Sequence, residues 1–431
     1  DHLLLPPVQW NSGQQLRREK TVGTRPGSAC RRRGVMTDRI PEGWRECKLA
    51  DVVNILPGFA FKSEHFGNEG IPVIKITDIN PPYINVNDAM KVDLTYYDSE
   101  KLEKYKISKD DFVIAMTGAT IGKIGRLNEN ITAIVNQRVA KIVPKESTDK
   151  KFVYYSIHGE DFQTFIQNNI DSNSAQENIS GTSISRYSIL LPPFHEQRAI
   201  ASVLGSLDDK IDLLNRENQT LEQMAEALFR QWFIEEADEK WEQVPLDQIA
   251  DYLNGLACQK YPPKNDFEKL PVLKIRELRN GSIDGSDWAT TDVPKEYIVQ
   301  NGDVIFSWSG SLLVKMWDGA KCVLNQHLFK VTSERYPKWF YYLWTIHHIN
   351  KFISIAEGKA TTMGHIKRED LSSSIVLIPN TNEFKYMDKV ISPLIEKIIL
   401  NNSQIRTLEK LRDTLLPKLM SGEVRVKICD A

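Results

Sequence analysis

The chain has 431 residues, of which 41% are hydrophobic and 26% are charged, and its formal net charge is −2 at pH 7. This length exceeds what one ordinary core needs, so two domains with connecting elements are expected in a soluble protein. No run approaches the ~18 apolar residues of a membrane span. The charge balance also weighs against a protein that coats nucleic acid by bulk charge, so any DNA binding must rely on local patches.

Metal and redox centres are not indicated by the sequence. The five cysteines are far apart and odd in number, and no two of them form a Cys-x-x-Cys pair. None of the eight histidines falls in a His-Glu-x-x-His spacing, so no metal site is expected. This cysteine usage predicts a reduced, cytoplasmic setting.

Residues 1–35 form a basic segment, with seven arginines and lysines against two acids. The segment lacks hydrophobic periodicity, and Met36 looks like a natural start. We therefore expect a disordered leader or a stretch added to the natural chain. The alternative is a basic arm that touches phosphates.

From Met36 onward the chain contains two similar halves. Residues 44–53 return as residues 241–250, which is a distance of 197 residues, and from residue 152 onward the distance stays at 187. Insertions and deletions are thus confined to the first part of each half, where variable loops can read different targets on one scaffold. Short apolar runs predict matching strands at residues 71–76 and 270–275 and at residues 111–118 and 303–310.

A long helix is predicted after each half. Residues 196–235 carry side chains of a heptad seam with one polar break, and the same phase returns 187 residues later in a helix from about residue 383 to residue 420. The two seams should pack as an antiparallel coiled coil, because burying apolar surface is favourable. The predicted seam residues are Ile211, Leu214, Asn218, Leu221 and Leu228 in the first helix and Ile398, Ile405, Leu408 and Leu415 in the second.

Three short motifs are similar to parts of enzymes but lack the required context. Residues 80–83 read Asn-Pro-Pro-Tyr, as in amino-methyltransferases, yet no glycine-rich turn for S-adenosylmethionine accompanies them, so a turn before a strand is predicted. Residues 118–123 are one residue short of a phosphate-binding loop, and Ile124 replaces its Mg²⁺-binding Ser or Thr, so a loop between strands is predicted. Residues 383–385 have the Glu-x-Lys of many nucleases but fall where a helix begins. No catalytic chemistry is expected in this chain.

The segments that bound the helices resemble those of type I restriction-modification specificity subunits. Residues 191–201 read Leu-Pro-Pro-Phe-His-Glu-Gln-Arg-Ala-Ile-Ala, which is similar to the start of the conserved helix of that family. Residues 228–233 resemble the end of that helix, and residues 415–424 resemble the tail of the second conserved helix. Residues 380–385 depart from the pattern, since they lack its Pro-Pro and Glu-Gln pairs.

The resemblance implies an α+β protein with two pseudo-repeated α/β target-recognition domains, separated by an antiparallel coiled coil of two long conserved helices. The expected boundaries are a leader at 1–35, a first domain at 36–192, a central helix at 193–240, a second domain at 241–380 and a C-terminal helix at 381–425.

The resemblance also implies a non-catalytic, cytoplasmic subunit that recognises a bipartite, asymmetric site in double-stranded DNA. Each domain would read one half-site, and the coiled coil would set the spacer. Two modification subunits would bring S-adenosylmethionine and methylate adenine, and restriction subunits would bring ATP and Mg²⁺ for translocation and cleavage. No cofactor is expected in this chain. Four residues inserted between Leu214 and Leu221 should lengthen the unread gap by ~2 base pairs.

Candidate DNA contacts are basic and hydroxyl side chains in the strand-turn-strand parts of both domains, because Lys and Arg bind phosphates while Arg, Ser and Thr can read base edges. For each of them a solvated surface role is an open alternative. The candidates are Lys62, Lys75, Thr77, Thr117, Thr120 and Lys123 in the first domain and Lys274, Arg276, Arg279, Ser307, Ser309 and Lys315 in the second.

Two further functions are left open by the sequence. One is an adenine methyltransferase that uses the segment from Asn80 to Tyr83 to hold the target base. The other is a coiled-coil scaffold for proteins that has no DNA role.

Overall fold

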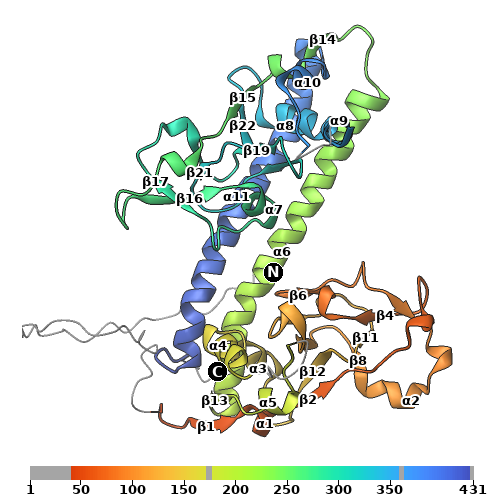
Figure 1. Cartoon of the computed structure of the whole chain (residues 1–431), viewed down its shortest axis with the longest axis vertical. Helices are drawn as coiled ribbons and strands as arrows, with labels where there is room; N and C mark the ends of the chain where they lie inside the picture. Colours follow the sequence, from red (N-terminus) through yellow and green to blue (C-terminus); the bar gives the residue numbers. More distant parts are fainter. Residues whose placement is uncertain (1–39, 171–176, 359–363, 428–431) are drawn as a thin grey trace, which may run out of the picture. The chain divides into compact units, whose positions relative to one another are not determined.

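The computed structural model describes residues 40–170, 177–358 and 364–427 (Figure 1). The expectation for the basic leader at residues 1–35 lies outside these ranges. Two similar sets of strands and short helices are each followed by one long helix, as the duplication predicts.

Each repeat is closed by a pair of strands at its ends. In the first repeat, β1 (Arg45–Lys48) runs antiparallel to β13 (Ser188–Leu191). In the second, β14 (Glu242–Pro245) pairs in the same way with β23 (Ile375–Ile378). The first and last strands of each repeat therefore meet just before its long helix begins.

Each repeat contains its own copy of a set of four antiparallel strands, in the same order. Its order in the first repeat is β2 (Val53–Pro57), β12 (Val139–Pro144), β9 (Phe112–Ala115) and β10 (Ile124–Arg126). Its order in the second is β15 (Asp251–Asn254), β22 (Leu328–Thr332), β19 (Val304–Ser307) and β20 (Leu313–Met316). The predicted strands at residues 111–118 and 303–310 are confirmed as β9 and β19. Both are buried along their whole length, which explains their unbroken apolar runs.

A second sheet in each repeat is built around a parallel strand pair. The pair is β4 (Ile71–Ile74) with β11 (Ala133–Val135) in the first repeat and β16 (Lys269–Leu273) with β21 (Cys322–Leu324) in the second. The strands predicted at residues 71–76 and 270–275 are thus confirmed. In the first repeat this second sheet also contains β3 (Phe66–Gly67), β7 (Lys91–Val92) and β8 (Lys106–Ile107). In the second repeat it also contains β17 (Trp288–Thr290) and β18 (Ile298–Val299). A hairpin of β5 (Ile79–Asn80) and β6 (Tyr83–Ile84) extends the edge of the other sheet in the first repeat.

Short helices complete each repeat. In the first they are α1 (Leu49–Val52), α2 (Ser99–Leu102), α3 (Lys150–Ser156), α4 (Glu160–Asn168) and α5 (Gly181–Ile184). In the second they are α7 (Ile275–Asn280), α8 (Lys338–His347), α9 (Ile349–Gly358) and α10 (Arg368–Ser372). The aromatic residues of α3 and α8 enter two separate hydrophobic cores, one for each repeat.

The long helices are α6 (Phe194–Arg230), which continues as a single π-helical turn at Gln231–Glu235, and α11 (Thr381–Met420). The start of α11 lies two residues before the predicted residue 383. The reason is local, because the Asn380 side chain caps the helix by accepting hydrogen bonds from the backbone N–H groups of Asn382 and Glu383.

The two long helices pack side by side and antiparallel (Figure 1). Leu204 near the start of α6 and Leu419 near the end of α11 share the first core, whereas Phe229 near the end of α6 and Ile391 near the start of α11 share the second. Between the cores, the helices bury the central part of the predicted seam: Ile211, Leu214, Asn218, Ile398 and Ile405. Leu221, Leu228, Leu408 and Leu415 are partly buried against the hydrophobic clusters. The antiparallel coiled coil is therefore confirmed.

In the described parts of the chain, no helix combines the length and the apolar character that a membrane crossing requires.

Candidate DNA-recognition surface

Both repeats contain the same largely covered lysine–aspartate pair beneath their loops. The Lys141 ammonium group lies 3.1 Å from an Asp111 carboxylate oxygen and donates to the carbonyl of Lys106. In the second repeat Lys330 forms the matching ion pair with Asp303 at 2.8 Å and donates to the carbonyl of Ile298. Burial would raise the pKa of Asp111, but the hydrogen bonds and charges of its lysine neighbours outweigh burial and lower it. These charges are therefore committed to the scaffold and not to a ligand.

The repeats differ most in the stretch of sequence between β2 and β9 in the first repeat and between β15 and β19 in the second. The first repeat places α2 and the small strands β3, β5, β6 and β7 there. The second repeat instead has α7 and β17 in this region. One framework thus supports two differently shaped surfaces, and half of the sequence candidates lie on them.

The first-repeat candidates on this layer are Lys62, Lys75 and Thr77. The Lys62 side chain is 70% exposed and lies 3.6 Å from Glu64, a distance typical of a loose surface ion pair. The Lys75 ammonium group lies 4.1 Å from the centre of the Phe66 ring, so its charge is partly used inside the repeat. Thr77 is exposed and its hydroxyl donates to Asp78 at 3.2 Å.

The loop that joins β9 to β10 carries Thr117, Thr120 and Lys123. Thr120 donates to the Thr117 carbonyl at 3.4 Å, whereas the Thr117 hydroxyl oxygen is buried without a hydrogen-bond partner among the described residues. The loop packs on α4, where the Gln163 amide donates to the carbonyl of Gly122. The Lys123 side chain is exposed, and no ion pair of it is found within the described ranges. Among these three residues, Lys123 is the one whose side chain is exposed to solvent.

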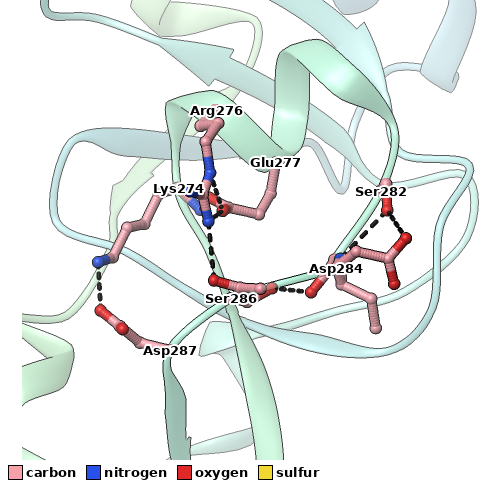
Figure 2. Close-up of polar contacts among 9 residues, drawn as sticks. Lys274, Arg276, Glu277, Ser282, Asp284, Ser286 and Asp287 are labelled. Carbon is pink, nitrogen blue, oxygen red and sulfur yellow. Dashed lines mark hydrogen bonds and ion pairs between the residues drawn. The ribbon is translucent and has the colours of Figure 1, made fainter. Parts of the chain in front are cut away.

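In the second repeat, Lys274 and Arg276 are held by a polar network around the loop before β17 (Figure 2). Lys274 forms a close ion pair with Asp287. The Arg276 guanidinium group donates to Glu277 at 2.8 Å and to the carbonyl of Gly285 at 2.8 Å. Either residue would have to leave or share these partners to contact DNA.

The remaining second-repeat candidates lie in three different surroundings. Arg279 is exposed in the last turn of α7, and no ion pair of its side chain is present in the part of the chain that the structure describes. Ser307 is 0% exposed and donates to the Ser309 carbonyl, so both residues support the turn after β19. Lys315 lies 3.1 Å from Asp318 in a polar cleft of about 210 Å³ that also borders α6 and α11, so it faces the helix pair.

Beside the turn after β19, Ser309 belongs to a polar and aromatic cluster whose other members, among them Trp308 and His327, were not sequence candidates. The Trp308 indole donates to Asn254 at 3.0 Å, and its ring centre lies 5.9 Å from that of His327. One nitrogen of His327 shares a hydrogen bond with Ser309 at 3.2 Å, and the other lies 3.3 Å from the Gln326 amide. The corresponding loop of the first repeat exposes Gln137 and Arg138.

A signal for this cluster is present in the sequence. The pairs Asn136-Gln137 and Asn325-Gln326 correspond between the repeats, and the next residue changes from Arg138 to His327. An unchanged turn that presents a different side chain in each copy is the pattern expected of a recognition position.

The enzyme-like motifs all have structural roles. Residues 80–83 form the tight turn between β5 and β6, with Asn80 paired to Tyr83, which confirms a turn before a strand. In the loop at residues 118–123, the amides of Gly118, Ile121, Gly122 and Lys123 donate to backbone carbonyls, so none of these four is available to a phosphate. The Glu383 carboxylate accepts a hydrogen bond from the Trp241 indole at 2.8 Å.

The described residues contain no group of three or more His, Cys, Asp or Glu side chains arranged to hold a metal ion. The three cysteines within these ranges, Cys47, Cys258 and Cys322, are free and buried.

Known proteins with similar sequences cover nearly the whole chain. The sequence model described as Type I restriction modification DNA specificity domain matches residues 41–223 and 238–410. The chain is 26% identical over 419 residues to the type I restriction enzyme MjaIX specificity subunit of Methanocaldococcus jannaschii, covering 90% of this chain and 95% of the relative. It is 22% identical over 437 residues to the EcoBI specificity subunit of Escherichia coli, covering 89% and 87%. Its fold is similar to the crystal structure of a type I restriction-modification S subunit from M. genitalium, with a TM-score of 0.57, 14% identity and coverage of 90% and 98%.

Proposed function

The chain belongs to the family of type I restriction-modification DNA specificity subunits, and from this premise we propose that each of its two repeats reads one half of a bipartite DNA site. As a specificity subunit it is non-catalytic. The coiled coil of α6 and α11 sets the number of unread base pairs between the half-sites.

The observation that carries this proposal is the contrast between the two layers of each repeat. The order and pairing of the four common strands and the largely covered lysine–aspartate pair are repeated, whereas the segments between the first strand and β9 or β19 differ between the copies. A duplicated framework with two different surfaces suits an asymmetric site better than a scaffold that needs two equal ends.

Four of the twelve sequence candidates are best placed for direct contact with DNA. Lys62, Thr77, Lys123 and Arg279 are exposed, and the cations among them have a weak ion pair or none among the described residues. Lys75, Lys274, Arg276 and Lys315 hold internal contacts, and Thr117, Thr120, Ser307 and Ser309 shape the loops that carry the contacts. Long cations on loops position a protein on phosphates, so this set supplies alignment more than base choice.

The partners in this proposal are two modification subunits, which bind S-adenosylmethionine and methylate one adenine in each half-site, and restriction subunits, which use ATP and Mg²⁺. The complex acts on DNA in the cytoplasm. Neither repeat carries a large excess of positive charge, so the modification subunits must supply much of the grip on the duplex.

Mapping methylated adenines tests the proposal. The chain is produced with a modification subunit in a host that has no other adenine methylation, and its DNA is sequenced for modified bases. We expect one motif with two specific blocks separated by a fixed unread gap. Methylation that follows a single continuous motif, or methyl transfer by the chain alone, would reject the proposal.

A further inference from the structure

The middle of the helix pair contains a polar layer where apolar side chains would be expected. Asn218 of α6 is 8% exposed and Asn401 of α11 is 0% exposed. The Asn401 amide nitrogen donates to the Asn218 oxygen at 2.9 Å and to Glu217 at 3.0 Å, and the Asn218 amide donates to Asn402 at 2.6 Å. One hydrogen bond therefore joins the two asparagines directly across the seam.

This layer is not explained by stability. The Asn401 side-chain oxygen has no hydrogen-bond partner within the described ranges, and an unsatisfied buried polar atom is unfavourable. The neighbouring layer, in which Leu214 packs with Ile405, is fully apolar. A buried asparagine in a coiled coil typically reduces stability while selecting which helices pair and in which register.

The duplication shows what the layer selects. At a distance of 187 residues, Asn218 of α6 corresponds to Ile405 of α11, and Leu214 corresponds to Asn401. In the observed antiparallel pair, asparagine therefore meets asparagine and the apolar residues meet each other. If α6 paired with another α6 in the same geometry, Asn218 would face Leu214 of the other copy twice. Two α11 helices would likewise place Asn401 against Ile405 twice.

A largely covered ion pair between α6 and α11 also forms only when the two unlike helices pair. Arg412 of α11 lies 3.0 Å from Asp208 of α6, and both side chains are largely covered. Arg412 corresponds to Ala225 and Asp208 corresponds to Ile395, again at a distance of 187 residues. Either like pair loses this contact. A pair of α11 helices would place Arg412 against an isoleucine and leave it only Asp413 of its own helix as a carboxylate partner among the described residues.

We propose that the Asn218–Asn401 layer and the Asp208–Arg412 pair make α6 select α11 and reject the corresponding helix of a second copy. The partner that the seam fits is the unlike half of the same protein. The consequence is that two different surfaces are always combined in one particle. This inference concerns the helix pair alone and does not depend on the DNA proposal.

The test cuts the folded full-length chain at a protease site introduced in the exposed linker at residues 238–240, so that only non-covalent contacts hold the halves together. The cut protein is warmed to allow exchange, cooled and examined by native mass spectrometry, which separates the like pairs from the unlike pair by mass. Wild type should return almost only the unlike pair. The double variant Asn218→Leu/Asn401→Leu should increase the ratio of like to unlike pairs by about tenfold or more.

The matched control moves the layer without changing its composition. Leu214→Asn and Ile405→Asn are added to the double variant, so that asparagine again meets asparagine only in the unlike pair. This variant should restore the wild-type ratio. An unchanged ratio in the double variant, or like pairs at the double-variant level in the control, would overturn the proposal. A double variant that melts below wild type would also overturn it, since an apolar layer should be at least as stable.

Discussion

Glu196 and Glu383 occupy the same place in the two repeats but have different neighbours. Each accepts a hydrogen bond from the indole of the tryptophan that opens its repeat, Trp44 or Trp241. Among the described residues only Glu196 also binds an arginine, since both of its oxygens accept from Arg425 at 2.8 and 2.9 Å. Burial would raise the pKa of Glu196, but its bonds to Arg425 and Trp44 outweigh burial and lower it.

Glu196→Gln should therefore destabilise the protein by about 1–3 kcal/mol at neutral pH, because it removes a charged partner from a nearly buried site. A group with a lowered pKa stabilises the fold above its ordinary value of ~4.3 and loses that effect as the pH falls through the lowered pKa. The difference between variant and wild type should thus be constant from pH 8 to 6 and shrink in acid. Urea unfolding at several pH values measures it. Glu383→Gln is the matched control with a smaller expected loss, and equal losses would contradict the role given to Arg425.

Lys123→Ala and Arg279→Ala test the exposed cations. If each contacts a phosphate, each variant should bind DNA more weakly by a similar factor at all sequences and lower the slope of log affinity against log salt by ~1. Electrophoretic shifts of the complex with the modification subunit, at several salt concentrations, give both quantities. Lys240→Ala, on the exposed linker, should change neither. A variant that changes the recognised sequence but not the salt slope would instead indicate contact with a base.

Residue types alone could not rank the DNA candidates. The sequence identifies cations and hydroxyls in the correct strands and turns, but it does not reveal that Ser307 is buried or that Arg276 bonds to the carbonyl of Gly285. Those facts depend on how distant segments pack. Trp308 was not predicted as a candidate, because an aromatic residue that follows a buried strand has the sequence pattern of a core residue. Its place beside the turn is visible only in the structure.

The long helices were the most predictable elements. The seam residues occur at heptad spacing in the sequence, and the phase of the heptads agrees in both copies. The π-helical turn at the end of α6 was not predicted, because it arises from packing: Phe233 of that turn is buried in the aromatic core of the second repeat. The short strands β3, β5 and β7 were also not predicted, since two residues give no periodicity.

The antiparallel pairing changes how the spacer prediction should be tested. α6 and α11 match layer by layer, so four residues added to α6 alone would displace its seam relative to α11. The cleaner change adds seven residues to each helix, between Leu214 and Asn218 and between Asn401 and Ile405. One heptad adds ~10 Å of helix, so the unread gap should grow by ~3 base pairs. Methylome sequencing reads the gap directly, and an unchanged gap would reject the spacer role.

The duplication organises the whole molecule. The largest hydrophobic cores of the two repeats are separate, and each includes one end of α6 and the opposite end of α11. The sequence predicted this arrangement because the repeat distance becomes fixed before the helices begin. It could not predict which surface each repeat would build, because the differing segments have no counterpart in the other copy with which to be compared.

The segment after α11 offers a consequence in terms of chain connectivity. Gly422, with its positive φ, lies against Pro41, and Arg425 reaches Glu196, so this segment packs on the start of the first repeat. This segment leads from the end of α11 to the start of the first repeat, as the linker at residues 236–240 leads from the end of α6 to the start of the second repeat at β14. The order of the halves along the chain is then arbitrary. A circular permutant that joins Lys427 to Ile40 through a short flexible linker and opens at residue 238 should fold and direct methylation to the same motif, and loss of the motif with an intact fold would show that chain order matters.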